Sequence, residues 1–187
     1  MPNVVVIAGP NGAGKSTLAP ALLRDTLNIP EYVNADTIAE GLSAFAPEDA
    51  SFEAGRVMLH RLKELARQRR DLSFETTLAS RFYANWIKSL KANGYRFTLM
   101  FLWLVSPDLA KERVKERVRL GGHDIPSATI ERRYERGMKN LFELYMPIAN
   151  TWSIRNTSAA ESVEIARHTD EEGERIFDEE VWNQIKK

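Results

Sequence analysis

The sequence predicts an α/β fold in which a mainly parallel five-stranded sheet is flanked by helices. Segments typical of strands alternate with segments typical of helices, an order that favours parallel pairing. The first apolar run, Val4–Ala8, is β-branched on both faces, as a central strand is. The 187 residues suit one domain spanning residues 1–187, and 43% apolar content is enough to bury a core.

The first half of the chain predicts three strands and two helices. The strands are Val4–Ala8, Tyr32–Asp36 and Asp71–Leu78, and the helices are Lys15 to about Arg24 and Pro47 to about Arg70. The loop Gly9–Gly14 joins the first strand to the first helix. Pro47 suits the first turn of a helix, and the acids Glu48 and Asp49 suit its positive end.

The second half predicts four further helices, two strands of the main sheet and a small hairpin. We expect a helix over Ser80–Asn93 with Gly94 as its left-handed cap, followed by a strand over Tyr95–Val105. A helix from Pro107 to about Leu120, capped by Ser106, comes next, and then a helix from about Ser127 that is interrupted near Pro147. The last elements are a strand over Ser153–Asn156, a hairpin of Val163–Arg167 with Arg175–Phe177, and a terminal helix from about Asp178. The fold expected is thus a five-stranded sheet with a helical lid and a small C-terminal hairpin plus helix.

Composition excludes several classes of protein and site. Lys and Arg total 26, as do Asp and Glu, and this balance argues against a nucleic-acid binder. The absence of cysteine excludes disulfides, thiolate metal sites and cysteine catalysis, and three scattered histidines argue against a histidine zinc site. The sequence shows no signal peptide and no apolar run long enough to cross a membrane. A reducing cytoplasm fits, although a chain without cysteine is compatible with any compartment.

One motif identifies a ligand. Residues 9–17, GPNGAGKST, match G-x-x-x-x-G-K-[ST] between a buried strand and a helix. Glycines let the backbone wrap phosphates, and the helix N-terminus adds partial positive charge. We expect Lys15 to contact the β- and γ-phosphates and Ser16 to hold Mg²⁺. The nucleotide-binding residues predicted here are Gly9, Pro10, Asn11, Gly12, Ala13, Gly14, Lys15, Ser16 and Thr17. The motif indicates ATP or another nucleoside triphosphate with magnesium, but no particular reaction.

Two carboxylates qualify as the group that orients and deprotonates an acceptor hydroxyl. Asp36 ends the second predicted strand and Glu75 lies near the end of the third, so both belong at the carboxyl edge of the sheet, where α/β folds bind ligands. Asp36 also suits a plain helix cap. No conventional second acid follows the strand over Tyr95–Val105, which ends in Ser106 and Pro107. Glu75 or Asp36 must therefore supply any second acidic contact to magnesium.

The segment Lys111–Arg136, here called the lid, is rich in arginine. Arg113 and Arg117 share a helix face, and Arg132, Arg133 and Arg136 follow the pair Gly121-Gly122. Guanidinium groups bind phosphate in a bidentate manner. We expect a mobile helical hairpin that brings at least one arginine onto the transferring phosphate, the alternative being a solvated helix pair.

These motifs together resemble the zeta toxin family of P-loop kinases in its compact chromosomal form. The likeness covers about residues 1–158. It rests on GPNGAGKST, on Asn34-Ala35-Asp36, on Phe74-Glu75-Thr76-Thr77, and on RVRLGGHDIP followed by IERRY within residues 117–134. The best-studied members of that family phosphorylate a hydroxyl of UDP-N-acetylglucosamine with ATP, and a protein antitoxin accompanies such toxins.

The resemblance implies roles for individual residues. Asp36 matches the catalytic base, and Glu75, with Thr76 beside it, matches the substrate-contacting position. Arg117 and one of Arg132 or Arg133 match the phosphate-binding arginines. Asn156 begins a short turn that resembles the one near the adenine. The catalytic set expected on this basis is Lys15, Asp36, Arg117 and Arg132, with Arg117, Arg133 and Asn156 also binding the nucleotide.

The leading hypothesis is an ATP-dependent kinase of a small hydroxyl compound, with a sugar nucleotide as a narrower version. A kinase of another small metabolite belongs to the same class. A second class is a slowly hydrolysing nucleotide-binding module that engages a protein partner. Neutral net charge argues against a nucleic-acid end kinase.

Overall fold

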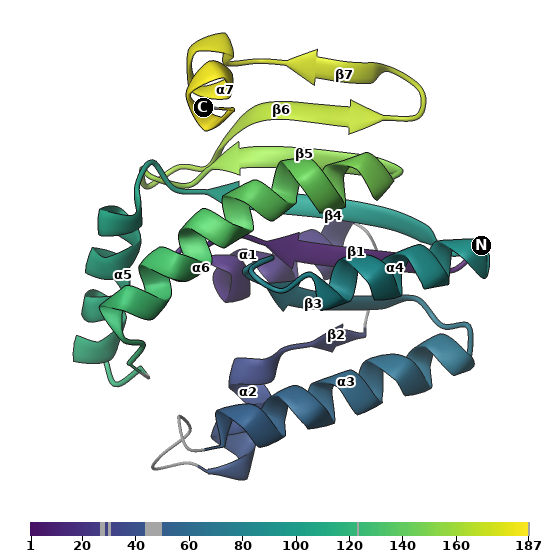
Figure 1. Ribbon diagram of the computed structural model, residues 1–187, viewed down its shortest axis with the longest axis horizontal. Coiled ribbons are helices and arrows are strands. Elements are labelled where there is room, and N and C mark those ends of the chain that lie inside the picture. The colour runs from purple at the N-terminus through teal and green to yellow at the C-terminus, as the bar shows by residue number, and fades with distance from the viewer. Residues whose placement is uncertain (27–28, 30, 44–49, 123, 187) are drawn as a thin grey trace.

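A seven-stranded sheet forms the centre of the molecule (Figure 1). The computed structural model describes residues 1–26, 29, 31–43, 50–122 and 124–186. The strands are β1 (Asn3–Ala8), β2 (Tyr32–Val33), β3 (Leu72–Thr76), β4 (Arg96–Trp103), β5 (Thr151–Asn156), β6 (Val163–Thr169) and β7 (Gly173–Ile176), in the spatial order β2-β3-β1-β4-β5-β6-β7. Strands β1 to β5 are parallel, as expected. The predicted hairpin, β6–β7, is real but extends the sheet through antiparallel pairing of β6 with β5.

The helices follow the predicted order. They are α1 (Lys15–Pro20), α2 (Ala35–Leu42), α3 (Ser51–Arg67), α4 (Phe82–Ala92), α5 (Pro107–Arg119), α6 (Ser127–Asn140) and α7 (Glu179–Ile185). A π-helical turn over Ala21–Thr26 prolongs α1, and another over Leu141–Tyr145 prolongs α6. The proposed helix start at Pro47 lies outside the described residues. No helix in the described ranges has both the length and the apolarity to cross a membrane.

The expected capping residues confirm how the sequence sets helix ends. The Ser106 side chain accepts a hydrogen bond from the Leu109 amide, and Asp178 accepts one from the Val181 amide. Gly94, just after α4, has φ 82°, the left-handed conformation that glycine adopts without strain. These three positions follow the predictions made from residue type alone.

The second strand is shorter than predicted. It ends at Val33 because the Asn34 side chain accepts hydrogen bonds from the amides of Asp36 and Thr37, at 2.7 and 3.3 Å, and so begins α2. Asp36 therefore lies in the first turn of a helix rather than in the strand. It still lies at the carboxyl edge of the sheet, because α2 begins where β2 ends.

Alternate residues of β1 enter two separate apolar cores, one on each face of the sheet. Val4 and Val6 pack on one side with α3, α4 and α7, whereas Val5 and Ile7 pack on the other with α1 and α5. Figure 1 shows α4 and α6 in front of the sheet and α1 behind it. This three-layer arrangement leaves the carboxyl ends of the parallel strands open between α1, α2 and α5.

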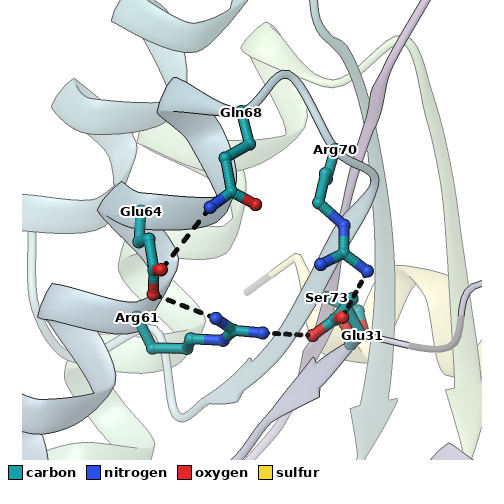
Figure 2. A network of polar contacts seen from close by, with 6 residues as sticks. All are labelled: Glu31, Arg61, Glu64, Gln68, Arg70 and Ser73. Carbon is teal, nitrogen blue, oxygen red and sulfur yellow. Dashed lines mark hydrogen bonds and ion pairs between the residues drawn. The ribbon is translucent and has the colours of Figure 1, made fainter.

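A polar network ties the edge strand β2 to α3 near the start of β3 (Figure 2). Glu31 forms ion pairs with Arg61 and Arg70 at 3.2 and 2.5 Å, and its carbonyl accepts hydrogen bonds from the amide and hydroxyl of Ser73. Arg61 also pairs with Glu64, which accepts a hydrogen bond from Gln68. These contacts fix the approach of the chain to β2, the strand that leads into α2.

Candidate active site

The loop between β1 and α1 is shaped by close backbone contacts. Gly9 has φ 147°, and a Cβ atom there would lie 2.3 Å from the Leu102 carbonyl oxygen on β4. Its amide donates to the Thr76 carbonyl at the end of β3. Glycine is thus required at position 9 by the neighbouring strand. The loop therefore contacts the carboxyl ends of β3 and β4, the two strands that pair with β1.

Lys15, the first residue of α1, is buried with only 8% of its surface exposed. Its ammonium group donates to the carbonyls of Gly9 and Pro10 at 3.0 and 2.9 Å. Burial lowers the pKa of Lys15, the Glu75 and Asp36 carboxylates oppose that shift, and Arg117 and Arg133 add to it. The charged side chains predicted from distant parts of the sequence therefore meet around Lys15.

Ser16 and Glu75 are brought together by the pairing of β1 with β3, which sets Glu75 opposite Ile7. The Ser16 hydroxyl donates to Glu75 Oε2 at 3.0 Å, and the Tyr32 hydroxyl donates to the same oxygen at 2.6 Å. The Asn34 amide group donates to the oxygens of both Ser16 and Tyr32 at 3.3 Å. Burial, followed by the Glu75 charge, raises the pKa of the Tyr32 phenol, which keeps it a hydrogen-bond donor.

Two cavities open beside Lys15, Asp36 and Glu75. The first cavity has a volume of about 270 Å³ and is lined by the motif of residues 9–17, here called the phosphate loop, up to Thr17 in α1. The helix α5 lines it through Arg113 and Arg117. The second cavity has a volume of about 290 Å³ and is lined by α2, by Met58 and Tyr83, and by Arg133. The end of β3 and the loop after it complete the lining with Thr76, Thr77, Ala79 and Ser80. Four residues line both cavities: Asn11, Lys15, Asp36 and Glu75. The two cavities therefore adjoin at these four side chains.

Some lid arginines line the cavities, whereas others are exposed on the surface. Arg117 lines the first cavity and Arg133 lines the second, and both are partly buried. Arg132 is exposed, and its guanidinium lies 3.5 Å from the Thr129 hydroxyl on its own helix. Of the pair left open by the sequence, the structure places Arg133 at the site and Arg132 outside it.

Both lid helices pack against the body of the protein. Ala110 and Val114 of α5, with Ile130 of α6, belong to the core that contains Val5 and Ile7. Lys111 pairs with Glu131 across the two helices at 2.9 Å. The structure thus shows the lid in a packed position, and its movement remains a prediction.

Arg113 joins the phosphate loop to the turn after β5. Its guanidinium donates to the carbonyls of Gly12 at 3.4 Å and Ser158 at 3.0 Å. In that turn, the Asn156 side chain accepts a hydrogen bond from the Ser158 amide. Asn156 therefore shapes a turn held close to the phosphate loop, although its side chain lines neither cavity.

Several residues at the site were not singled out from the sequence. Tyr32 contacts Glu75, and Tyr83 lines the second cavity. Tyr32 had a detectable signal, since a two-residue spacing on a strand places it on the same face as Asn34. Tyr83, which reaches the site from α4, had no comparable signal.

The residues present fit a nucleoside triphosphate with magnesium. The side-chain oxygen of Asn11 is buried and finds no hydrogen-bond partner among the described residues, which is unusual unless a ligand approaches. Lys15 and Arg117 supply positive charge beside the first cavity, and Ser16 and Glu75 supply oxygen ligands of the kind Mg²⁺ prefers.

Solved structures with this fold include ATP-binding proteins, toxins and kinases. The structure matches a crystal structure of AvrRxo1-ORF1:ORF2 with ATP at a TM-score of 0.81 and 15% identity, covering 99% of this chain and 63% of that chain. It matches the PezAT chromosomal toxin–antitoxin system of Streptococcus pneumoniae at 0.59 and 18%, covering 87% and 72%. It matches a gluconokinase from Sinorhizobium meliloti 1021 at 0.54 and 17%, covering 84% of each chain.

Identities this low show the fold alone, and this chain covers less than two thirds of the matched chain in the AvrRxo1-ORF1:ORF2 structure. The fold is that of a P-loop kinase: a sheet of seven strands flanked by helices, with the phosphate loop after β1. The sequence gives the family directly, because a family model described as AAA domain matches residues 4–141. The chain therefore belongs to the AAA domain family AAA_33 and has a P-loop kinase fold.

Proposed function

We propose that this protein is an ATP-dependent kinase that transfers the γ-phosphoryl group to a hydroxyl of a small molecule. The observation that supports this most is the pair of adjoining cavities with Lys15, Asp36 and Glu75 at their junction. A nucleotide-binding protein without an acceptor needs only the first cavity. A second cavity reached by the same carboxylates supports a second substrate.

The first cavity suits the nucleotide. Backbone amides of the phosphate loop, Lys15 and Arg117 would hold the phosphates, and the turn containing Asn156 lies on the side proposed for the base. Ser16 and Glu75 would hold magnesium, which when bound neutralises phosphate charge. Arg117 comes from the lid, so closure of that segment would strengthen its contact as charge develops in transfer.

Asp36 suits the general base better than Glu75 does. Glu75 Oε2 already accepts two hydrogen bonds, from Ser16 and Tyr32. The Asp36 backbone amide is engaged with Asn34, but its carboxylate makes no hydrogen bond or ion pair within the described ranges. A carboxylate free to accept a proton, at the junction of the cavities, is what hydroxyl activation requires. Glu75 and Thr76 would then contact the acceptor or the metal.

Two acceptor classes have support. The likeness to the PezAT toxin–antitoxin structure, with the motifs shared with zeta toxins, supports UDP-N-acetylglucosamine or a related sugar nucleotide. The likeness to a gluconokinase supports another small metabolite. Zeta toxin membership and an antitoxin partner are part of the proposal in its narrower form.

A nucleotide-binding module that engages a protein partner is the second candidate. Two of the matched structures are of systems with a second protein, AvrRxo1-ORF2 and the PezAT antitoxin, which favours this alternative specifically. Acceptor dependence separates the two functions. A kinase consumes ATP faster when its acceptor is added, whereas such a module responds to a protein or to neither.

The test is a search for a new phosphorylated species. Purified protein is incubated with ATP, Mg²⁺ and a metabolite extract, and products are compared by mass spectrometry with those from Lys15→Ala. A product formed only by the wild type supports the kinase and identifies its acceptor. ATP consumption that no extract accelerates would contradict it.

A further inference from the structure

Arg133 is a cation that lines the second cavity. It is partly buried, and it forms no hydrogen bond or ion pair with any residue in the described ranges. Every other lysine or arginine that lines the two cavities makes a contact. Lys15 contacts Gly9 and Pro10, Arg113 contacts Gly12 and Ser158, and Arg117 has a partner of its own. A half-buried guanidinium that lines a cavity and makes no such contact has its N–H donors available for an anionic ligand.

The carboxylates near Arg133 do not neutralise it. Asp36 acts on it through space, and the pKa of Arg133 is lowered by burial despite that attraction. Glu75 is occupied by Ser16 and Tyr32. The remaining lining is mostly neutral, with hydroxyls from Thr76, Thr77, Ser80 and Tyr83. The cavity therefore combines hydroxyl groups for a polar acceptor with one guanidinium for an anion.

The position of Arg133 is fixed by the rest of α6. One turn further on, Gly137 packs so closely on the loop after β3 that a Cβ atom would lie 2.4 Å from the Thr77 carbonyl oxygen. Asn140 donates to the Leu78 carbonyl at 2.7 Å, and Tyr145 donates to the Ser80 carbonyl at 2.6 Å. Close contacts thus join the C-terminal part of the helix that carries Arg133 to the loop that lines the cavity, and such preorganisation favours ligand binding.

We infer that Arg133 binds an anionic group of the acceptor, so that the substrate is a hydroxyl compound bearing a carboxylate or phosphate. This inference rests on the proposed kinase function. It assigns the two inward lid arginines to different substrates, Arg117 to the nucleotide and Arg133 to the acceptor. Guanidinium groups bind carboxylate and phosphate alike, because both groups carry negative charge and present a pair of oxygens to the N–H donors.

The test compares matched acceptors that differ in charge. The pairs are gluconate with glucose, glycerol 3-phosphate with glycerol, and UDP-N-acetylglucosamine with N-acetylglucosamine. Wild type, Arg133→Ala, Arg133→Lys and the exposed control Arg136→Ala are assayed for phosphoryl transfer. We expect the wild type and Arg136→Ala to prefer the anionic member of at least one pair. That preference should fall about 10- to 100-fold in Arg133→Ala, with partial recovery in Arg133→Lys. The preferred pair separates carboxylate from phosphate.

A binding arm makes the result independent of turnover. Each protein is saturated with a non-hydrolysable ATP analogue and Mg²⁺, and calorimetry measures binding of the same six compounds. Anion-selective binding that Arg133→Ala loses and Arg136→Ala keeps supports the inference even without transfer, in which case only the kinase proposal fails. If the wild type binds the anionic and the neutral member of every pair with the same affinity, the inference is overturned. The inference is also overturned if Arg133→Ala lowers the affinity for the ATP analogue and leaves the preference for anionic acceptors unchanged, because Arg133 then binds the nucleotide.

Discussion

The two cavities adjoin at shared side chains, yet they are built in different ways. The first cavity is dominated by a continuous stretch, residues 11–17, whose backbone and side chains lie on one loop and one helix. The second is assembled from α2, α3, the loop after β3, α4 and α6, which are separated by up to about a hundred positions. A site on one continuous segment keeps its chemistry wherever the segment is placed, whereas an assembled site depends on how the helices pack.

This difference explains why the nucleotide class is easier to assign than the acceptor. The first cavity is a motif with a known ligand type. The second has a lining that becomes visible only when α6 packs on the loop after β3. Substitutions that affect one cavity and spare the other test whether the division is functional.

Asp36→Asn is expected to have the largest effect on transfer alone. The amide keeps the shape of the side chain but cannot take the hydroxyl proton, so the rate of transfer should fall about 10²- to 10⁴-fold. Binding of a non-hydrolysable ATP analogue should stay at the wild-type level. Single-turnover transfer and calorimetry check the two statements. An equal loss of analogue affinity would make Asp36 a metal contact and remove it from the role of base.

Lys15→Ala should lower turnover roughly 10²- to 10³-fold, because it removes a charge that stabilises the transferring phosphate. Since Lys15 lies at the junction, both ATP hydrolysis and acceptor phosphorylation should fall. Thermal unfolding monitored by circular dichroism serves as the control for an intact fold. Turnover at the wild-type rate in a folded variant would mean that the first cavity is not the nucleotide site.

The fold was predictable from the sequence because its signals are local. Ser106, Gly94 and Asp178 end or begin helices through hydrogen bonds and dihedral angles within a few residues. The parallel strands were evident from apolar runs such as Val4–Ala8. The pairing of β6 with β5 was not predicted, because the residue pattern within a strand does not identify the neighbour of that strand in the sheet.

The site was predictable where one motif carries it. Lys15 and Ser16 follow from the loop pattern, and Asp36 and Glu75 follow from their places at strand ends. The choice between Arg132 and Arg133 could not be made, because two adjacent helical residues point about 100° apart and only packing decides which one faces inward. The contacts of Gly137 and Asn140 with the loop after β3 decide it here.

Gly137→Ala should damage the second cavity and spare the first. The added methyl would meet the Thr77 carbonyl, so α6 or the loop must move, with a loss of about 1–3 kcal/mol in the free energy of unfolding. A displacement of that size next to reacting groups can lower kcat/KM for the acceptor up to about 10²-fold. Affinity for the ATP analogue should not change. Gly55→Ala on α3, where a Cβ meets no atom within 4 Å, is the matched control. Similar losses of kcat/KM for the acceptor and of affinity for the ATP analogue would show that the two cavities are not functionally separate.

Tyr32→Phe should give the smallest effect and the one most specific to magnesium. Phenylalanine keeps the ring but removes the hydroxyl that donates to Glu75 Oε2 at 2.6 Å, leaving Ser16 as the hydroxyl partner of that oxygen. Residues that orient a metal-binding carboxylate commonly contribute about tenfold or more in affinity. We therefore expect the Mg²⁺ concentration for half-maximal turnover to rise roughly tenfold, while the rate at saturating Mg²⁺ stays within a few-fold of wild type. Glu75→Gln provides the reference, since it should shift the same Mg²⁺ dependence further. A Tyr32→Phe variant with an unchanged Mg²⁺ requirement but a higher acceptor KM would move Tyr32, and Glu75 with it, from the metal to the acceptor side of the junction.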